Sequence, residues 1–365
     1  MDNTIQDIEM VRLGITTDEE KAEYEENKIE TNKKISKINF SARQLAKKNM
    51  CPICKKEVSS FCNSHSIPRF CLQNISSAGK VMSPLQNEIP SLGKDLGLKQ
   101  AGTFHIICND CDGKIFQDYE NPDAYSSEPT NKMLSQIALK NYLLQISKRY
   151  EEYELYGLLA QQFPNSKDVS ELKKNISYID LQSYLSELLF ATKAISSNSK
   201  NYHLCFFKRL DYVVPFSAQS SIAMVSDFED IVINDLFCGN PKYEIKDIHI
   251  AVFPLKSSSV IIVFFKNGEK RYRRFSKQLN LLSPDDQLAA INYIIFSYSE
   301  NVFLNPEIHK ILQNDNCFMD VCRKTTDVIA TFPFPNQFFL EKGISEFSLS
   351  KRNSIPNLLS QEYAL

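Results

Sequence analysis

The sequence predicts an α+β protein, and three features support this expectation. Two stretches in the middle of the chain, 131–163 and 179–195, carry apolar residues at helical spacing. After residue 200 the pattern changes to short runs of β-branched and aromatic residues, which are typical of strands. Before both lies a cysteine-rich region. We therefore expect four parts: a charged arm or helix over 1–44, a cysteine-rich module over 45–130, a helical connector over 131–200 and an antiparallel α+β domain over 201–365.

Composition excludes several classes of protein. The chain of 365 residues contains only 10 glycines and neither of the glycine-rich strings that bind nucleotide phosphates. Its formal net charge is −2, so a surface for nucleic acid has to come from local segregation of charge. The apolar run 260–265 is too short to cross a bilayer, and the first ten residues have no signal-peptide pattern. We expect a cytoplasmic protein without a membrane partner, whose 10 cysteines remain reduced.

Charge patterning predicts the N-terminal elements. The first 30 residues are rich in acids and favour a polar helix or a loosely ordered arm over about 17–35. Residues 31–50 then hold six basic side chains and no acidic one, and the segment ends with Lys47 and Lys48. This basic segment can follow a nucleic-acid backbone, because phosphate contacts need positive charge more than shape. An exposed amphipathic helix is the alternative.

Periodicity and helix breakers predict the remaining elements. A long loop is expected over 76–103, where Ser, Gly, Pro and Lys are frequent. The helix over 131–163 ends before Pro164, and residues 196–199 form a linker after the second helix. Asn267-Gly268 predicts a hairpin between the runs 260–265 and 270–275. A further helix is expected over 284–299, with Ser283 as its cap, and the last 35 residues are expected to form an irregular tail.

Two C-x2-C pairs dominate the cysteine-rich module. They are Cys51 with Cys54 and Cys108 with Cys111, and together they can supply four thiolates to one tetrahedral zinc ion. The 53 residues between the pairs are a longer spacer than usual. The pairs nevertheless predict a structural zinc. Two alternatives remain open, namely buried thiols without metal, or two zinc sites that also use Cys62, His65, Cys71 and His105.

Between the two pairs stands the string Ser64-His65-Ser66-Ile67-Pro68-Arg69. A C-x2-C pair, then H-x-I-P, then a second C-x2-C pair followed by an acid and a short helix resembles the HNH nucleases with zinc-ribbon knuckles, members of the His-Me finger (ββα-metal) superfamily. The resemblance covers about residues 50–122 and fits a divergent subgroup with S-H-x-I-P. The residues that carry it are Cys51, Cys54, His65, Ile67, Pro68, Cys108, Cys111, Asp112, Phe116, Tyr119 and Glu120.

The resemblance implies a zinc-ribbon ββα-metal module that acts as an endonuclease on DNA or RNA, with DNA the more expected partner. In such enzymes a histidine activates water against a phosphodiester bond, and His65 takes this position. One Mg²⁺ or Mn²⁺ ion assists, with Asp112 at the start of the helix as a ligand and His105 as a second candidate ligand. The zinc holds this helix relative to the strand of His65. A role in bacterial or phage-related defence is the context that the resemblance suggests.

Two positions depart from the family pattern. Ser64 precedes the histidine where the family often has an acid, and no residue cleanly replaces the central asparagine, although His105 stands near its place. Glu120 follows Asp112 by eight residues, about 12 Å along a straight helix, so the two carboxylates bind one ion only if the helix breaks.

Other basic residues are candidates for contact with nucleic acid. Arg69 follows the H-x-I-P string and can bind a phosphate, or be an ordinary surface arginine. Basic and aromatic residues alternate over 266–277, which suits either single-stranded nucleic acid or a charge-protected edge hairpin. The C-terminal domain has no catalytic string and can recognise a protein partner or a trigger. The alternative to a nuclease is a non-catalytic zinc-ribbon protein that binds nucleic acid or a protein partner.

Overall fold

The computed structural model describes residues 10–12, 18–86, 96–163, 167–236, 238, 240, 242–329 and 336–365. The α-helices are α1 (Asp18–Ala46), α2 (Arg69–Ile75), α3 (Asn109–Ile115), α4 (Asn131–Gln162), α5 (Lys167–Ile195), α6 (Arg271–Leu281), α7 (Pro284–Tyr298), α8 (Pro306–Leu312), α9 (Asn316–Arg323) and α10 (Asn336–Phe347). The strands are β1 (Met10–Arg12), β2 (Ser64–His65), β3 (Lys80–Val81), β4 (Leu96–Gly97), β5 (Thr103–Phe104), β6 (Tyr202–Leu210), β7 (Phe216–Ile222), β8 (Ile248–Pro254), β9 (Ser259–Lys266), β10 (Val302–Leu304) and β11 (Asp327–Ile329). Helices and antiparallel strands together confirm the α+β class. Within the described part of the chain, no helix is both long and apolar enough to span a membrane.

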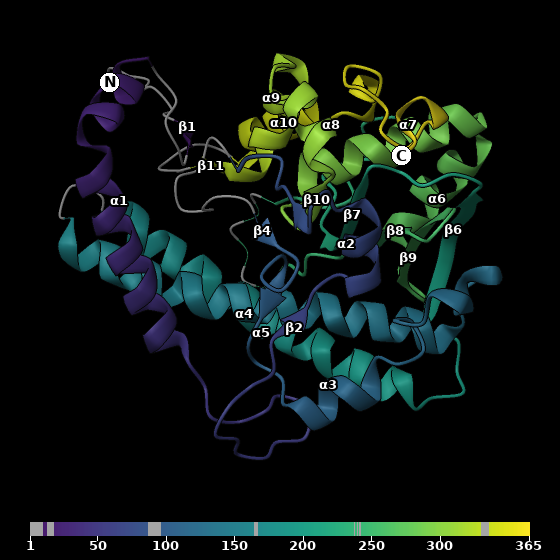
Figure 1. The fold of residues 1–365 in the computed structure, drawn as a ribbon, viewed down its shortest axis with the longest axis horizontal. Helices are drawn as coiled ribbons and strands as arrows, with labels where there is room; N and C mark the ends of the chain where they lie inside the picture. The colour runs from purple at the N-terminus through teal and green to yellow at the C-terminus, as the bar shows by residue number, and fades with distance from the viewer. Residues whose placement is uncertain are drawn as a thin grey trace.

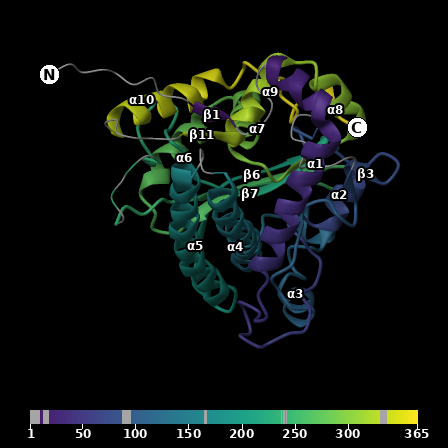
Figure 2. The same cartoon turned by 90° about the vertical axis from the view of Figure 1, so that its left-hand side faces the viewer.

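A five-stranded antiparallel sheet forms the middle layer, in the order β10-β7-β8-β9-β6. Every residue of β7 and β8 is buried, as is β9 up to its last residue. A sheet that is buried on both faces needs cover on both sides. Figures 1 and 2 show this cover, because α4 and α5 lie against one face while α6, α7 and α9 lie on the other. The molecule therefore has three layers, with an apolar core on each side of the sheet.

The cysteine-rich module packs on the same side of the sheet as α4 and α5. Within it, β2 pairs with β5 in antiparallel fashion, so that His65 lies opposite Thr103. Four residues separate the end of β5 from the start of α3. This order, two paired strands followed by a helix, is compatible with the ββα arrangement that the resemblance implies for the module. A second two-stranded pair, β3 and β4, belongs to the segment between β2 and β5, where the sequence predicts a long loop. Residues 87–95 of that predicted loop lie outside the described part of the chain.

Hydrogen bonds join this module to the distant edge of the sheet. Ser66 donates from Oγ to Oδ1 of Asn301 at 2.8 Å. Asn305 donates from Nδ2 to the carbonyl of Ile75 at 3.0 Å. Both pairs are buried and span more than 200 residues of sequence. The N-terminal module is therefore bound directly to the segment that contains β10.

Several predicted elements are confirmed, and others are corrected. The long helix α4 ends at Gln162, just before Pro164, and Ser283 caps α7 by accepting a hydrogen bond from the amide of Asp286. The acidic residues from Asp18 onward lie in the helix α1. The helix α5 begins at Lys167, earlier than the predicted start at residue 179. The predicted hairpin around Asn267-Gly268 is wrong, because residues 271–281 form the helix α6 and not a second strand. Tyr272, Phe275 and Leu279 recur at helical spacing and are buried, so packing against the sheet favours a helix over a strand. The expected tail includes the helix α10.

One apolar cluster crosses the predicted boundary at residue 200. It contains Ile67 and Phe104 of the cysteine-rich module, Leu139 of α4, and Phe253 and Phe264 of the sheet. All five side chains are buried. The division into a helical connector and a C-terminal domain remains a prediction, and the two parts share this cluster.

Candidate functional site

Four cysteines lie close together at one end of the module. Cys51 and Cys54 lie in a turn, Cys108 precedes α3 and Cys111 lies in its first turn. Their sulfur atoms all lie within 4.8 Å of one another. The Cys54 and Cys108 sulfurs are 3.8 Å apart, and a tetrahedral zinc with zinc–sulfur bonds of about 2.3 Å has sulfur–sulfur edges of about 3.8 Å. The cluster can therefore hold a metal ion such as zinc.

The acidity of these thiols depends on their surroundings. Burial opposes ionisation of Cys51, but hydrogen bonds from the backbone around Cys108, Cys54 and Ile53 lower the pKa of its thiol to about 7. Burial and the neighbouring sulfur of Cys108 raise the pKa of Cys111. Crowded thiols resist ionisation together unless a cation neutralises them, and a bound metal supplies that charge.

The described residues do not support the two-zinc alternative. Only the four cysteines of the two C-x2-C pairs form a metal-binding cluster in that part of the chain. Burial and the negative charge of Asp112 raise the pKa of Cys62 to about 12. Cys71 is fully buried, and burial raises the pKa of its thiol well above the ordinary value. Cys62 and Cys71 are therefore thiols that fill space in the module.

His65, the predicted base, is half-buried on β2 and faces the backbone before β5. Its Nε2 lies 2.8 Å from the carbonyl oxygen of Leu98. A carbonyl only accepts hydrogen bonds, so Nε2 carries a proton and donates it. A neutral ring with a proton on Nε2 has its lone pair on Nδ1. The contact with Leu98 thus selects the tautomer of His65.

Asp112, the predicted metal ligand, is bound by two donors of this chain. Ser64 donates from Oγ to Oδ1 of Asp112 at 2.6 Å, and Lys140 donates from Nζ to the same oxygen at 2.9 Å. Successive side chains of a strand point to opposite faces. Ser64 therefore faces α3 and α4, whereas its neighbour His65 points to the other side of β2.

Lys140 is the centre of this cluster. Its side chain is 1% exposed, and its Nζ also lies 3.0 Å from Oγ of Ser64 and 3.2 Å from Oε1 of Glu120. The ammonium lies 3.7 Å from the centroid of the Phe116 ring, on the ring face. A cation over a ring face is attracted by the electron density of the ring. We name Ser64, Asp112, Phe116, Glu120 and Lys140 the lysine cluster.

The turn after α3 brings the two carboxylates of the lysine cluster together. The helix ends at Ile115, and the amide of Glu120 donates to the carbonyl of Phe116 at 3.1 Å. Gln136, one turn before Lys140 on α4, donates to the carbonyl of Ile115 at 2.6 Å and accepts from the amide of Tyr119 at 3.1 Å. The helix therefore breaks between Asp112 and Glu120, and both carboxylates contact one cation, the ammonium of Lys140.

Gln136 and Lys140 are not among the residues that the sequence patterns predict for the site. Both stand in the middle of a helix whose residues 133–144 are all buried. The sequence signal that could have identified them is a glutamine and a lysine among the apolar residues of a helix. Buried polar side chains need partners, so such residues indicate a polar cluster.

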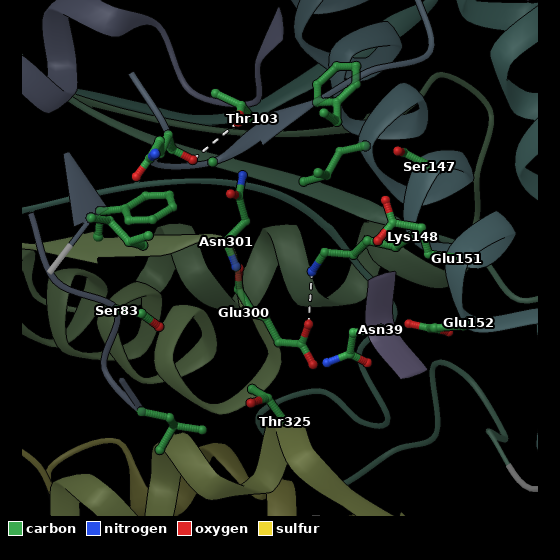
Figure 3. A pocket seen from close by; sticks show the side chains of 18 of the residues that line it. Asn39, Ser83, Thr103, Ser147, Lys148, Glu151, Glu152, Glu300, Asn301 and Thr325 are labelled. Atoms are coloured by element: carbon green, nitrogen blue, oxygen red, sulfur yellow. Dashed lines mark hydrogen bonds and ion pairs between the residues drawn. The ribbon is translucent and has the colours of Figure 1, made fainter. Parts of the chain in front are cut away.

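The other predicted ligand, His105, lies apart from the lysine cluster. It is exposed and lines a cavity of about 690 Å³ between α1, α4 and the segment around β10 (Figure 3). Lys148 of α4 points into this cavity, and its Nζ lies 2.8 Å from Oε2 of Glu300. The positive charge of Lys148 holds the pKa of Glu300 below its usual value. Asp112 does not line the cavity, so the structure does not bring the two predicted metal ligands together.

The predicted contacts for nucleic acid in and beside the module are accessible to solvent. Arg69 is exposed as the first residue of α2, and Lys47 and Lys48 are exposed just after α1. The ammonium of Lys48 lies 4.3 Å from the centroid of the Tyr150 ring. All three side chains are therefore on the surface, Arg69 at the start of α2 and the two lysines just after α1.

Three of the six basic residues of 266–277 have partners within the protein. Lys266 lies 3.0 Å from both carboxylate oxygens of Glu187. Arg271 donates to the carbonyl of Glu244 at 2.8 Å. Arg274 forms ion pairs with Asp227 and Glu229. These contacts anchor α6 and the end of β9, whereas Lys270, Arg273 and Lys277 are exposed.

Comparison of the chain with protein-family models, with curated proteins and with solved structures gives no match. The resemblance to HNH nucleases therefore depends on the motif residues and on the geometry described above.

Proposed function

We propose that this protein is an endonuclease that hydrolyses phosphodiester bonds of nucleic acid, with His65 as the general base. The observation that carries the proposal is the hydrogen bond from Nε2 of His65 to the carbonyl of Leu98. A base needs a free lone pair and a fixed orientation. The contact with Leu98 orients the ring and leaves the lone pair on Nδ1, for which the described part of the chain provides no hydrogen-bond partner.

The proposed step is attack by water on phosphorus. Nδ1 of His65 takes a proton from the water as the water oxygen bonds to phosphorus. The bond from phosphorus to the leaving sugar oxygen breaks, and solvent returns a proton to that oxygen. Arg69 follows His65 by four residues and is exposed at the start of α2. Its guanidinium is suited to bind the phosphate that is attacked, because a planar fork of donors matches two phosphate oxygens.

A structural zinc in the four-cysteine cluster is part of the proposal. Cys108 and Cys111 hold the start of α3, and Cys51 and Cys54 belong to the turn before β2. A metal that joins both turns restricts the position of β2 relative to α3. This rigidity supports a base whose ring has to stay in place.

The divalent ion that the resemblance implies does not fit the described donor set. Oδ1 of Asp112 already accepts from Ser64 and Lys140, and His105 faces the cavity of Figure 3. We therefore assign no step to Mg²⁺ or Mn²⁺.

A non-catalytic zinc protein that binds nucleic acid or a protein partner is the second candidate. The same engagement of Asp112 by Lys140 favours it, because a nuclease of this type was expected to keep that carboxylate for a metal ion. The exposed side chains of Arg69, Lys47 and Lys48 suit binding without cleavage equally well.

Cleavage by purified full-length protein tests the proposal, with single- and double-stranded DNA and RNA as substrates. The replacement His65→Ala should reduce the cleavage rate by about 10²–10⁴-fold, the usual contribution of a general base. His203→Ala removes a histidine from β6 and is the control, expected to cleave like the wild type.

Two results contradict the nuclease proposal. In the first, His65→Ala cleaves as fast as the wild type. In the second, the wild type retains zinc and binds nucleic acid but cleaves none of the substrates, which favours the second candidate. Loss of zinc from His65→Ala would instead make His65 a metal ligand.

A further inference from the structure

We infer that the ammonium of Lys140 is the resident cation of the Asp112–Glu120 pair and takes the place of a divalent metal ion there. The inference concerns the site of the proposed function and says how that site differs from a metal-dependent nuclease. It predicts that this protein binds no divalent ion at Asp112 and that any cleavage through His65 is independent of Mg²⁺.

The first argument is that the ammonium has all the partners it can bind. An ammonium group has three N–H donors and no acceptor. Nζ of Lys140 has three oxygens at hydrogen-bonding or ion-pairing distance, namely Oδ1 of Asp112 at 2.9 Å, Oγ of Ser64 at 3.0 Å and Oε1 of Glu120 at 3.2 Å. The face of the Phe116 ring also contacts the ammonium. Donors and acceptors therefore match in number.

The second argument concerns the carboxylate of Asp112. Its Oδ1 accepts two hydrogen bonds, from the Ser64 hydroxyl and from Lys140. A carboxylate oxygen has two lone pairs, so this oxygen is fully used. A metal ion at this oxygen would have to displace both an ammonium and a hydroxyl.

The third argument is that the Lys140 ammonium is buried and has no direct access to solvent. It is 1% exposed and belongs to the stretch of α4 in which every residue from 133 to 144 is buried. A displaced ammonium would remain buried without a partner, which is strongly unfavourable. Ser64, where the family often has an acid, contributes a neutral hydroxyl to the cluster. The lysine cluster therefore accommodates the positive charge of the Lys140 ammonium and not that of a metal ion.

Binding of Mn²⁺ to the zinc-loaded full-length protein, measured by electron paramagnetic resonance, tests the inference. The wild type should bind no Mn²⁺ at this place, so its signal should not change in Asp112→Asn. Lys140→Met removes the ammonium and leaves two adjacent carboxylates, so it should bind one equivalent of Mn²⁺. Lys148→Met removes a lysine from the same helix, outside the lysine cluster, and should bind Mn²⁺ no better than the wild type. The double variant Asp112→Asn/Lys140→Met should lose the Mn²⁺ that Lys140→Met gains.

Thermal unfolding is the second readout. Ligands that bind the folded state raise the melting temperature. Mn²⁺ should raise the melting temperature of Lys140→Met but not that of the wild type. Failure of Lys140→Met to fold leaves the wild-type comparison with Asp112→Asn as the deciding test.

Two results overturn the inference. One is a wild-type protein that binds Mn²⁺ and loses it in Asp112→Asn. The other is a folded Lys140→Met protein that binds no Mn²⁺. Neither measurement uses a substrate, so a failure here is distinguishable from a failure of the nuclease proposal, which the cleavage assay with His65→Ala decides.

Discussion

Neighbouring residues in the S-H-x-I-P string have different surroundings, because β2 alternates its faces. Ser64 joins the lysine cluster, whereas His65 binds the carbonyl of Leu98. The resemblance to HNH nucleases identified His65 and Asp112 as a pair of candidate residues. It could not identify Leu98 or Lys140, which lie 33 and 76 residues away from His65 and Ser64 and meet them only through tertiary packing. Candidate residues were thus predictable at this scale, and their partners were not.

Cys108→Ser should release the metal and loosen residues 45–130. Structural zinc sites contribute an apparent free energy of about 10–16 kcal/mol in small zinc peptides, so loss of one ligand is expected to disturb the whole module. Elemental analysis should find one zinc per chain in the wild type and much less in the variant. Hydrogen exchange should show faster exchange within 45–130.

The control for Cys108→Ser is Cys317→Ser, which changes an exposed cysteine on α9 and should leave the zinc content unchanged. A zinc content near zero in folded wild-type protein would contradict a structural zinc. A content near two would restore the two-site alternative.

Helices and strands were predictable where one local pattern dominates. The apolar periodicity of α4 and the Ser283-Pro284 start of α7 were sufficient to predict these helices. The sequence 270–275 was ambiguous, because alternating basic and aromatic residues fit a strand and also place Tyr272 and Phe275 on one helix face. Burial of those two rings against the sheet decides for α6. Local sequence does not contain that information.

The interface between α4 and β8 holds a buried histidine. Nδ1 of His249 accepts from the Asn141 amide at 3.1 Å, and its Nε2 lies 3.3 Å from the hydroxyl of Tyr142. The carbonyl oxygen of Asn141 accepts from Gln219 at 3.0 Å, which fixes the orientation of the amide. Burial lowers the pKa of His249 to about 3. The folded protein therefore keeps this histidine neutral.

His249 should make the protein less stable as the pH falls from about 6.5 to about 3. In this range the unfolded chain protonates the histidine and the folded protein does not, so protons favour unfolding. The contribution to the free energy of unfolding should decrease by about 1.4 kcal/mol per pH unit. Urea unfolding of the wild type and of His249→Gln at several pH values measures it, and the variant should lack this part of the slope.

The carboxyl group of Asp247 also changes how the free energy of unfolding depends on pH. Burial raises the pKa of its carboxyl to about 7, so between about 3.8 and 7 its contribution to stability decreases as the pH rises. This trend is opposite to that of His249. Subtracting the slope of His249→Gln from that of the wild type removes the contribution of Asp247, because both proteins contain this residue. Equal slopes for the two proteins would contradict the role assigned to His249.

For the whole molecule, the sequence predicted the α+β class but not how the elements pack against one another. The strands β6 to β10 form one antiparallel sheet, whereas β11 pairs with β1 near the N-terminus. One face of that sheet, with Phe253 and Phe264, packs in the same cluster as α4 and the cysteine-rich module. Fully buried strands are apolar on both faces, and nothing in the residues themselves says which segments cover each face.

The fragment 201–365 should therefore fail to show a cooperative thermal transition, although the change of pattern near residue 200 predicts a separate domain there. Without residues 1–200, the face of the sheet that contains Phe253, Ile262 and Phe264 is exposed to water. Exposure of a large apolar surface removes stabilisation and promotes aggregation. Differential scanning calorimetry of the purified fragment measures the transition.

The fragment 131–365 is the matched comparison for 201–365. It retains α4 and α5 and should recover part of the cooperative transition. A sharp transition in 201–365 at the temperature of the full chain would show that the sheet does not need this cover.

The bonds from Ser66 to Asn301 and from Asn305 to Ile75 also determine when the protein can finish folding during synthesis. A ribosome releases the chain from its N-terminus, so the cysteine-rich module emerges long before β10 exists. The module can bind its metal early, but the polar groups that it presents to β10 have no partners until residue 305 has left the exit tunnel. Contacts that span so much sequence form slowly. The nascent module therefore remains undocked for most of translation, and its inner face is exposed to chaperones during that time.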